Sequence, residues 1–202
     1  MENLTSILIA VVMSVFVFWY IYEIFTSKVR PSLSTWIIYF IGTSLSLITY
    51  LSASNWDFAS NFVNVMDPLV SASIIIAVIL FSKAKVKFNS FEKWYLTGGA
   101  LIIIFWGFSS SSFVSNLLTQ LLIFVSYFPT IQKIITEKTK TESRFAWSMM
   151  LLAGVIAIFP AVASENLLSI IYTERTILMP SIIIFLLFLI DRNSAKAKLI
   201  NK

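Results

Sequence analysis

The sequence contains no cysteine and no histidine. Without cysteine it can form no disulfide, no iron–sulfur cluster and no thiolate metal site. Without histidine it lacks the commonest general base and the commonest metal ligand. It also has no Walker-type phosphate loop and no pair of carboxylates spaced for acid–base chemistry. We therefore expect neither an enzyme nor a protein that holds a metal ion or another cofactor.

Charge is scarce as well: 12% of the 202 residues are charged and 58% are hydrophobic. A soluble domain carries about twice that share of charge. Long uncharged runs indicate membrane helices, and because the runs are continuous rather than alternating they exclude a β-barrel. The net charge of +5 then belongs to loops beside a lipid bilayer, and we expect no nucleic acid partner. No basic residue precedes the first run and no small-residue cleavage site follows it, so a cleaved signal peptide is not expected.

Seven apolar stretches are candidates to cross a hydrocarbon core of about 30 Å, although the fourth and the seventh are short for it. They are Ser6–Phe25, Ser34–Ser52, Val65–Ser82, Trp94–Phe108, Val114–Ile135, Phe145–Ala163 and Thr176–Ile190. All but one of the fifteen Lys and Arg residues lie after the first, third, fifth and seventh stretches or, as Lys133 does, in the last turn of one of them. The exception, Arg175, is expected in an outer loop. The positive-inside rule then puts the N-terminus outside and the C-terminus in the cytoplasm.

The chain also carries an internal repeat. Trp36 and Trp147 are 111 residues apart, and Pro68 and Pro180 are 112 apart. The first three stretches thus match the last three, and the fourth is the extra crossing that two units of one orientation require. The sequence predicts an all-α integral membrane protein with seven transmembrane helices in a 3+1+3 tandem parallel repeat. Its parts are a first bundle (1–90), a connector (91–112) and a second bundle with a cytoplasmic tail (113–202).

The clearest part of the repeat is the segment Ser126–Trp147. It contains Pro129-Thr130-Ile131, then a polar loop, then Trp147; the loop includes Thr139, Thr141 and Ser143. With the 3+1+3 pattern, these residues resemble the SWEET / PQ-loop superfamily of transporters, which includes the KDEL receptor. Pro129–Ile131 stands at the place of the family's "PQI" motif, with Thr130 replacing the glutamine. Pro160 stands where SWEET-like proteins carry a helix-bending proline.

Two other family prolines are replaced here by Phe18 and Thr49, so the resemblance is to a divergent, bacterial-type branch. It implies a cell-membrane protein, most simply of a bacterial inner membrane. The implied function is transport of a sugar-like or vitamin-like small molecule by alternating access of the two bundles. A homo-oligomer stays open.

Polar residues on the third stretch repeat at three and four residues, so Asn64, Asp67 and Ser71 share one helical face. Polar groups inside a membrane usually face a cavity or a partner. Asn64 also resembles in type the sugar-binding asparagine of SWEET-like transporters on this span. We expect all three residues to contact substrate; the alternative is that Asn64 and Asp67 only cap the helix start.

Two further spans contribute to the expected substrate site. Asn116, Gln120 and Tyr127 fall near one face of the fifth span, where the Gln120 amide can exchange hydrogen bonds with a ligand. The alternative for Gln120 is a helix–helix hydrogen bond worth about 0.6 kcal/mol. On the second span, Ser46 and Tyr50 are expected to line the pocket, although small hydroxyl residues often serve packing.

Pro129 and Pro160 are expected to kink their helices, as static bends or as hinges. Glu23, near the cytoplasmic end of the first span, is either a gate or a partner of Lys28. Trp36 and Trp147 lie beside basic loops, which favours an interfacial aromatic belt over a functional pair.

Two other functions stay open beside transport: a receptor of the KDEL-receptor type that binds without flux, and a structural membrane protein. A carboxylate receptor would need a cation in its pocket, and we expect no Lys or Arg deep within a span, since only Lys133 falls inside one, near its cytoplasmic end.

Overall fold

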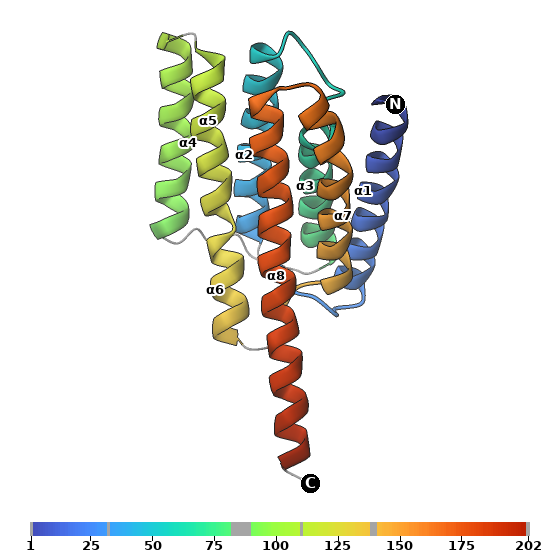
Figure 1. Cartoon of the computed structure of the whole chain (residues 1–202). Helices are drawn as coiled ribbons and strands as arrows, with labels where there is room; N and C mark the ends of the chain where they lie inside the picture. Colours follow the sequence, from blue (N-terminus) through green and yellow to red (C-terminus); the bar gives the residue numbers. More distant parts are fainter. Residues whose placement is uncertain (1, 32, 82–89, 110, 138–140, 201–202) are drawn as a thin grey trace.

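The computed structural model describes residues 2–31, 33–81, 90–109, 111–137 and 141–200, and within these ranges every regular element is an α-helix (Figure 1). The helices are α1 (Glu2–Phe25), α2 (Leu33–Ala53), α3 (Phe62–Phe81), α4 (Ser90–Ser109), α5 (Ser112–Ser126), α6 (Phe128–Glu137), α7 (Arg144–Ala163) and α8 (Leu167–Ile200). The expected all-α fold is confirmed. Ser82 and Thr139, named above, lie outside the described ranges, as do six of the lysines that set the expected orientation: Lys83, Lys85, Lys87, Lys138, Lys140 and Lys202.

Six helical segments of the described chain are long and apolar enough to cross a membrane, which indicates a multi-pass membrane protein. They are Leu4–Phe25, Thr35–Ala53, Phe62–Phe81, Ser112–Glu137, Arg144–Ala163 and Leu167–Arg192. The fourth expected span, Trp94–Phe108, falls in α4, a 20-residue helix that is not among the six. Its first turns carry Glu92 and Lys93, and its middle carries two glycines, which lower its mean hydropathy.

The last expected span is wrong at its start. The expected span Thr176–Ile190 leaves Arg175 in an outer loop, but α8 already begins at Leu167 and includes Arg175. In the helix, Glu174 is exposed while Arg175 is only 5% exposed. Consecutive helical residues point about 100° apart, so one of these two charges can face outward while the other faces the bundle interior.

α5 shows why these sequences fold as membrane helices. Its inner face is mostly polar, with Ser115, Asn116, Thr119, Gln120, Ile123 and Ser126 buried. Its outer face exposes Phe113, Leu118 and Leu121. A helix of a water-soluble protein shows the opposite arrangement. The side-chain nitrogens of Asn116 and Gln120 donate to α2, and the hydroxyls of Thr119 and Ser126 donate to carbonyls of their own helix. The apolar side chains of the outer face are suited to lipid.

The helices run roughly parallel to one common axis, and chain connections alternate between the two ends of the bundle (Figure 1). α3 packs against both α1 and α2, and α8 packs against both α5 and α7. Two further contacts, α1 with α7 and α2 with α5, join the first part of the chain to the last. α4 lies at one edge and packs mainly against α5. The C-terminal part of α8 extends beyond the other helices at the end opposite the N-terminus.

Gly154 allows α7 and α8 to approach closely. A Cβ atom at this position would lie 3.0 Å from Cγ1 of Ile177 and 3.2 Å from the carbonyl carbon of Thr176. We expect Gly154→Val to lower the free energy of unfolding by about 1–3 kcal/mol, because the helices must separate. Detergent unfolding titrations measure this. Gly107→Val is the matched control, since a Cβ there would meet nothing within 4 Å; equal effects at both sites would contradict the prediction.

Candidate functional site

Five buried residues form a hydrogen-bonded cluster inside the bundle, which we call the central cluster: Tyr39, Asp67, Tyr127, Tyr172 and Arg175. Oδ2 of Asp67 accepts hydrogen bonds from the Tyr39 hydroxyl at 3.1 Å and from the Tyr172 hydroxyl. The Tyr127 hydroxyl donates to that of Tyr39 at 3.1 Å, and Nη1 of Arg175 donates to Tyr127 at 3.4 Å. The Arg175 guanidinium also lies 4.3 Å from the centre of the Tyr172 ring. Each of the five side chains is at most 6% exposed.

The central cluster joins helices from the two halves of the chain. Tyr39 and Asp67 come from α2 and α3, whereas Tyr172 and Arg175 come from α8, where a spacing of three residues puts them on one face. Tyr127 sits at the C-terminal cap of α5. The hydrogen bonds between Asp67 and Tyr172 and between Tyr39 and Tyr127 therefore cross between the halves.

Several buried polar atoms of the central cluster and of other expected site residues make no hydrogen bond within the described residues. They are Oδ1 of Asp67, Nε and Nη2 of Arg175, both side-chain atoms of Asn64, and Oε1 of Gln120. Arg175 is close enough to Asp67 for their charges to attract, but that attraction leaves these hydrogen-bonding positions unfilled. An unsatisfied polar group in a membrane interior is costly, and such groups usually serve a ligand or a pathway.

The structure corrects two expectations about this region. Asn64 and Asp67 do not cap α3, because they are its third and sixth residues and Asp67 bonds to tyrosines of other helices. The expectation that no Lys or Arg lies deep within a span is also wrong, since Arg175 lies inside the apolar segment Leu167–Arg192. Asn64 and Arg175 stand at corresponding positions of the expected internal repeat, because they are 111 residues apart, as Trp36 and Trp147 are.

Asn116 and Gln120 link α5 to α2 through side-chain hydrogen bonds. Nδ2 of Asn116 donates to the Ser46 carbonyl at 2.8 Å and to the Thr49 hydroxyl at 3.0 Å. Nε2 of Gln120 donates to the Ser46 hydroxyl at 2.7 Å and to Oδ1 of Asn116 at 3.2 Å. The helix–helix bond considered for Gln120 is therefore present, and Oε1 is the only Gln120 atom left for a ligand.

Two other expected site residues lie apart from these groups. The Tyr50 hydroxyl bonds to Ser60 at 2.6 Å and accepts from Ser169 at 3.0 Å, joining the end of α2 to the start of α8. Ser71 donates to the Asp67 carbonyl of its own helix at 2.8 Å. Within the described residues, neither side chain bonds to a side chain of the central cluster: Tyr50 links α2 to α8, and Ser71 bonds to the backbone of its own helix.

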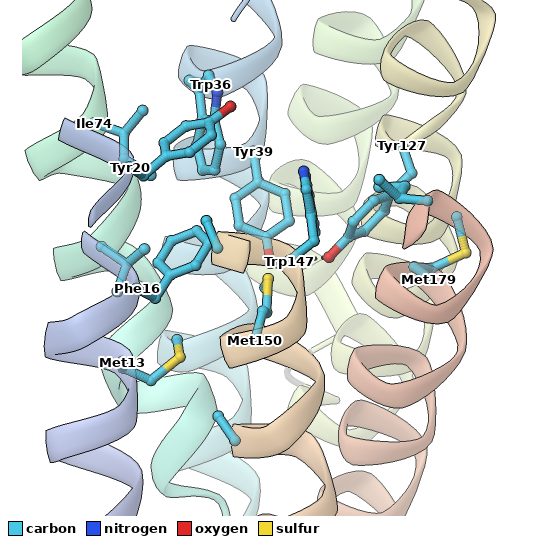
Figure 2. Close-up of a cluster of buried hydrophobic side chains, with 14 of the residues drawn as sticks. Met13, Phe16, Tyr20, Trp36, Tyr39, Ile74, Tyr127, Trp147, Met150 and Met179 are labelled. Atoms are coloured by element: carbon cyan, nitrogen blue, oxygen red, sulfur yellow. Dashed lines mark hydrogen bonds between the residues drawn. The ribbon is translucent and has the colours of Figure 1, made fainter. Parts of the chain in front are cut away.

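Trp36 and Trp147 are not a lipid-facing belt, because they are only 6% and 5% exposed. Figure 2 shows them with Tyr39 and Tyr127 inside the bundle. The four rings belong to the wall of a small cavity lined by Thr35, Trp36, Tyr39, Ser126, Tyr127, Thr130, Trp147 and Met150. About 20 Å³ is open to the centre of a water-sized sphere. That is room for a water molecule and far below the roughly 300 Å³ of a small-molecule pocket.

A second buried carboxyl, Glu142, lies just before α7 and outside the six apolar segments. It accepts hydrogen bonds from the Tyr20 hydroxyl of α1 at 2.5 Å and from Nε1 of Trp147 at 3.2 Å. Nearby, the Arg30 amide donates to the Thr141 carbonyl at 3.2 Å. These bonds hold the α1–α2 connection and the segment before α7 together at the end of the bundle opposite the N-terminus.

Glu142 should make stability depend on pH. Burial raises the pKa of its carboxyl above the usual 4.5, although Tyr20, Trp147 and the positive charge of Lys133 oppose the shift. Because the pKa of Glu142 is raised in the folded state, the protonated side chain contributes its full stabilisation below pH 4.5. This contribution is lost as the pH rises through the folded-state pKa. We expect Glu142→Gln, which stays neutral, to remove this loss. If the free energy of unfolding changed with pH in the same way for Glu142→Gln and for the unsubstituted protein, the prediction would be contradicted.

Pro129 is the second residue of α6 and follows a break at Tyr127, so the expected interruption of the fifth span is present. Phe18, its counterpart in the first unit, lies in the uninterrupted α1 and is 75% exposed. Pro160 lies in the last turn of α7, and its carbonyl accepts from the Ser164 amide at 3.0 Å. Glu23 is buried near the end of α1, and its carbonyl accepts from the Lys28 amide at 2.8 Å.

Sequence reasoning missed Tyr39, Tyr172, Arg175 and Glu142. A signal for Arg175 was present: Leu167–Tyr172 is uncharged and contains neither glycine nor proline, so the apolar run of the last span can be extended backward across it. Tyr172 then falls three residues before Arg175, on the same face. Glu142 carried no such signal, since it stands among polar loop residues.

Comparison with models of protein families, with curated proteins and with solved structures found no match. The geometry of the buried polar groups is therefore the basis for a functional proposal.

Proposed function

We propose that this protein is a membrane transporter or facilitator that moves a small polar metabolite by alternating access of two three-helix bundles. The observation that carries the proposal is the central cluster. It contains a buried aspartate and a buried arginine, contributed by the two halves of the chain, with hydrogen-bonding positions left unfilled. Buried charges in membrane helices mark pathways for ions and substrates more often than structural contacts.

The contacts between helices support the 3+1+3 repeat on which this mechanism depends. α1 and α2 pack on α3 as α5 and α7 pack on α8. In the repeat, α1 corresponds to α5 and α2 corresponds to α7. The contact between α1 and α7 therefore has its counterpart in the contact between α5 and α2, and both contacts are present. This relation is expected for a parallel repeat about an axis along the membrane normal. The proposed interface between the units would thus be formed by α1, α2, α5 and α7.

The charges support an orientation with the N-terminus outside. Among the described residues, Lys28, Arg30 and Arg144 lie in or beside connections at the end opposite the N-terminus. We propose that this end faces the cytoplasm. The Trp36–Trp147 cavity and the Glu142 contacts would then form the inner closure, and the conformation corresponds to an occluded state.

Reconstituted vesicles test the proposal. We expect counterflow of at least one labelled sugar, vitamin, nucleoside or amino acid, and raised thermal stability of the detergent-solubilised protein with the same compound. Gln120→Ala should weaken that stabilisation, whereas Ser73→Ala, which loses only a bond to Leu69 of its own helix, should not. No flux with any compound of the panel, together with no change for Gln120→Ala, would contradict transport.

One observation favours a second candidate, a membrane receptor that binds without flux. Arg175 supplies the buried cation that such a receptor needs for a carboxylate. Saturable binding without any counterflow in the same vesicles would support the receptor over the transporter.

A further inference from the structure

We propose that the ligand of the central cluster is a small zwitterion of the amino-acid type, with its carboxylate bound by Arg175 and its ammonium group bound by Asp67. This inference rests on the proposed function, since it names the class of compound that the site would take. It depends on which atoms of the two charged residues are already engaged and which are not.

The carboxylate subsite follows from the unused edge of Arg175. Its Nη1 donates to Tyr127 and its plane covers the Tyr172 ring, so these contacts fix the position of the guanidinium. Nε and Nη2 have no hydrogen-bond partner within the described chain. These two nitrogens form one side of the guanidinium, with N–H bonds that are nearly parallel. That two-donor edge matches the two oxygens of a carboxylate.

The ammonium subsite follows from the unused oxygen of Asp67. Oδ2 is held by Tyr39 and Tyr172, whereas Oδ1 has no partner in the described ranges. The two tyrosines fix the carboxylate by one oxygen and leave the other to accept. Asn64, on the same face of α3 one turn earlier, has an unfilled carbonyl oxygen and amide as well. An ammonium group carries three donors and no acceptor, which suits these oxygens.

Charge balance separates a zwitterion from a simple acid or amine. Asp67 and Arg175 carry opposite charges and lie within reach of each other's field. A ligand that carries only a carboxylate would leave one net negative charge inside a membrane protein, and an amine would leave one positive charge. A zwitterion leaves the sum at zero, and thus avoids an uncompensated charge in a region of low dielectric constant.

Neutral sugars fit the same atoms less well. A sugar hydroxyl can accept from Arg175, but it presents single acceptors rather than the paired oxygens that the Nε and Nη2 edge can engage together. The prediction is therefore selectivity for charged groups at both ends of a small molecule, with binding lost when either end is removed.

Thermal stabilisation and counterflow of the full-length protein test this inference without a mutation. The standard L-amino acids are screened singly. Each one that responds is then compared with its analogue lacking the amine, its analogue lacking the carboxylate, and glucose. We expect at least one amino acid to stabilise and to exchange, and each analogue to bind at least about 10-fold more weakly.

Variants of Arg175 and Asp67 then test which residue binds the carboxylate and which binds the ammonium group of the ligand. Arg175→Gln should weaken binding about 100-fold, and Arg175→Lys should not restore it, because lysine lacks the two-donor edge. Asp67→Asn should reduce the preference for the amino acid over its deaminated analogue. The double variant Asp67→Asn/Arg175→Gln keeps the pair neutral and covers the case that a single change prevents folding. Ser181→Ala is the control and should bind normally, because within the described part of the chain Ser181, on α8, bonds to the Ile177 carbonyl alone.

The outcomes separate the two proposals. Counterflow of a sugar with no response to any amino acid would overturn the zwitterion and leave transport standing. Stabilisation by an amino acid without counterflow would overturn transport and support the ligand class. Equal binding of an amino acid and its deaminated analogue would overturn the role given to Asp67.

Discussion

Asp67→Ala should lower the free energy of unfolding by about 3–5 kcal/mol. The change removes the only carboxylate in the central cluster and leaves the Arg175 guanidinium, which is 5% exposed, without a compensating charge. It also removes the acceptor of the Tyr39 and Tyr172 hydroxyls. Reversible unfolding of the purified protein in mixed micelles, followed by tryptophan fluorescence, measures the change.

The double variant Asp67→Ala/Arg175→Met provides the control. Replacing both members of a buried ion pair by apolar groups is often close to neutral, whereas removing one member is not. We expect the double variant to recover more than half of the loss caused by Asp67→Ala. A double variant as unstable as the sum of its single changes would show that the two charges do not stabilise each other.

Trp147→Ala should cost about 3 kcal/mol of unfolding free energy. The side chain is 5% exposed, lines the small cavity and donates to Glu142. In a bilayer the transfer of the ring from water contributes little, because lipid is as apolar as the protein core. The cost comes from the enlarged cavity, at about 24 cal/mol per Å³, and from the lost hydrogen bond.

Trp94→Ala is the matched control, since Trp94 is 76% exposed on α4. It should change stability by less than about 0.5 kcal/mol. The pair of variants decides between an interfacial tryptophan and a core tryptophan at position 147. If the two substitutions had equal small effects, the cavity would not contribute to the stability of the bundle.

Composition and charge placement were enough to predict the class of fold, because each depends on properties that act locally along the chain. Apolar length fixes where a helix can cross a bilayer, and six of the seven expected spans have counterparts among the apolar segments. The break before Pro129 was also predictable, since proline removes a backbone donor wherever it stands.

The site was predictable only in part, because it depends on which helices meet. Asn116 and Gln120 were expected to face a ligand, but the side-chain nitrogens of both residues donate to α2, and Gln120 also donates to Asn116. Asp67 was identified from its position inside a span, but its partners Tyr172 and Arg175 are more than 100 residues away. Trp36 and Trp147 show the same limit: proximity to basic loops is a local property, and burial between helices is not.

The break between α5 and α6 has an energetic consequence that its geometry alone does not reveal. Tyr127, the residue at the break, is also the residue through which Arg175 and Tyr39 are connected. If α6 rotated about this point, the hydrogen bonds of Tyr127 to Tyr39 and Arg175 would change, and occupation of the charged groups would change the free energy of that rotation by the same amount. The Tyr127 hydroxyl, which bonds to both Tyr39 and Arg175, would then link the bend of the helix to the occupation of the site.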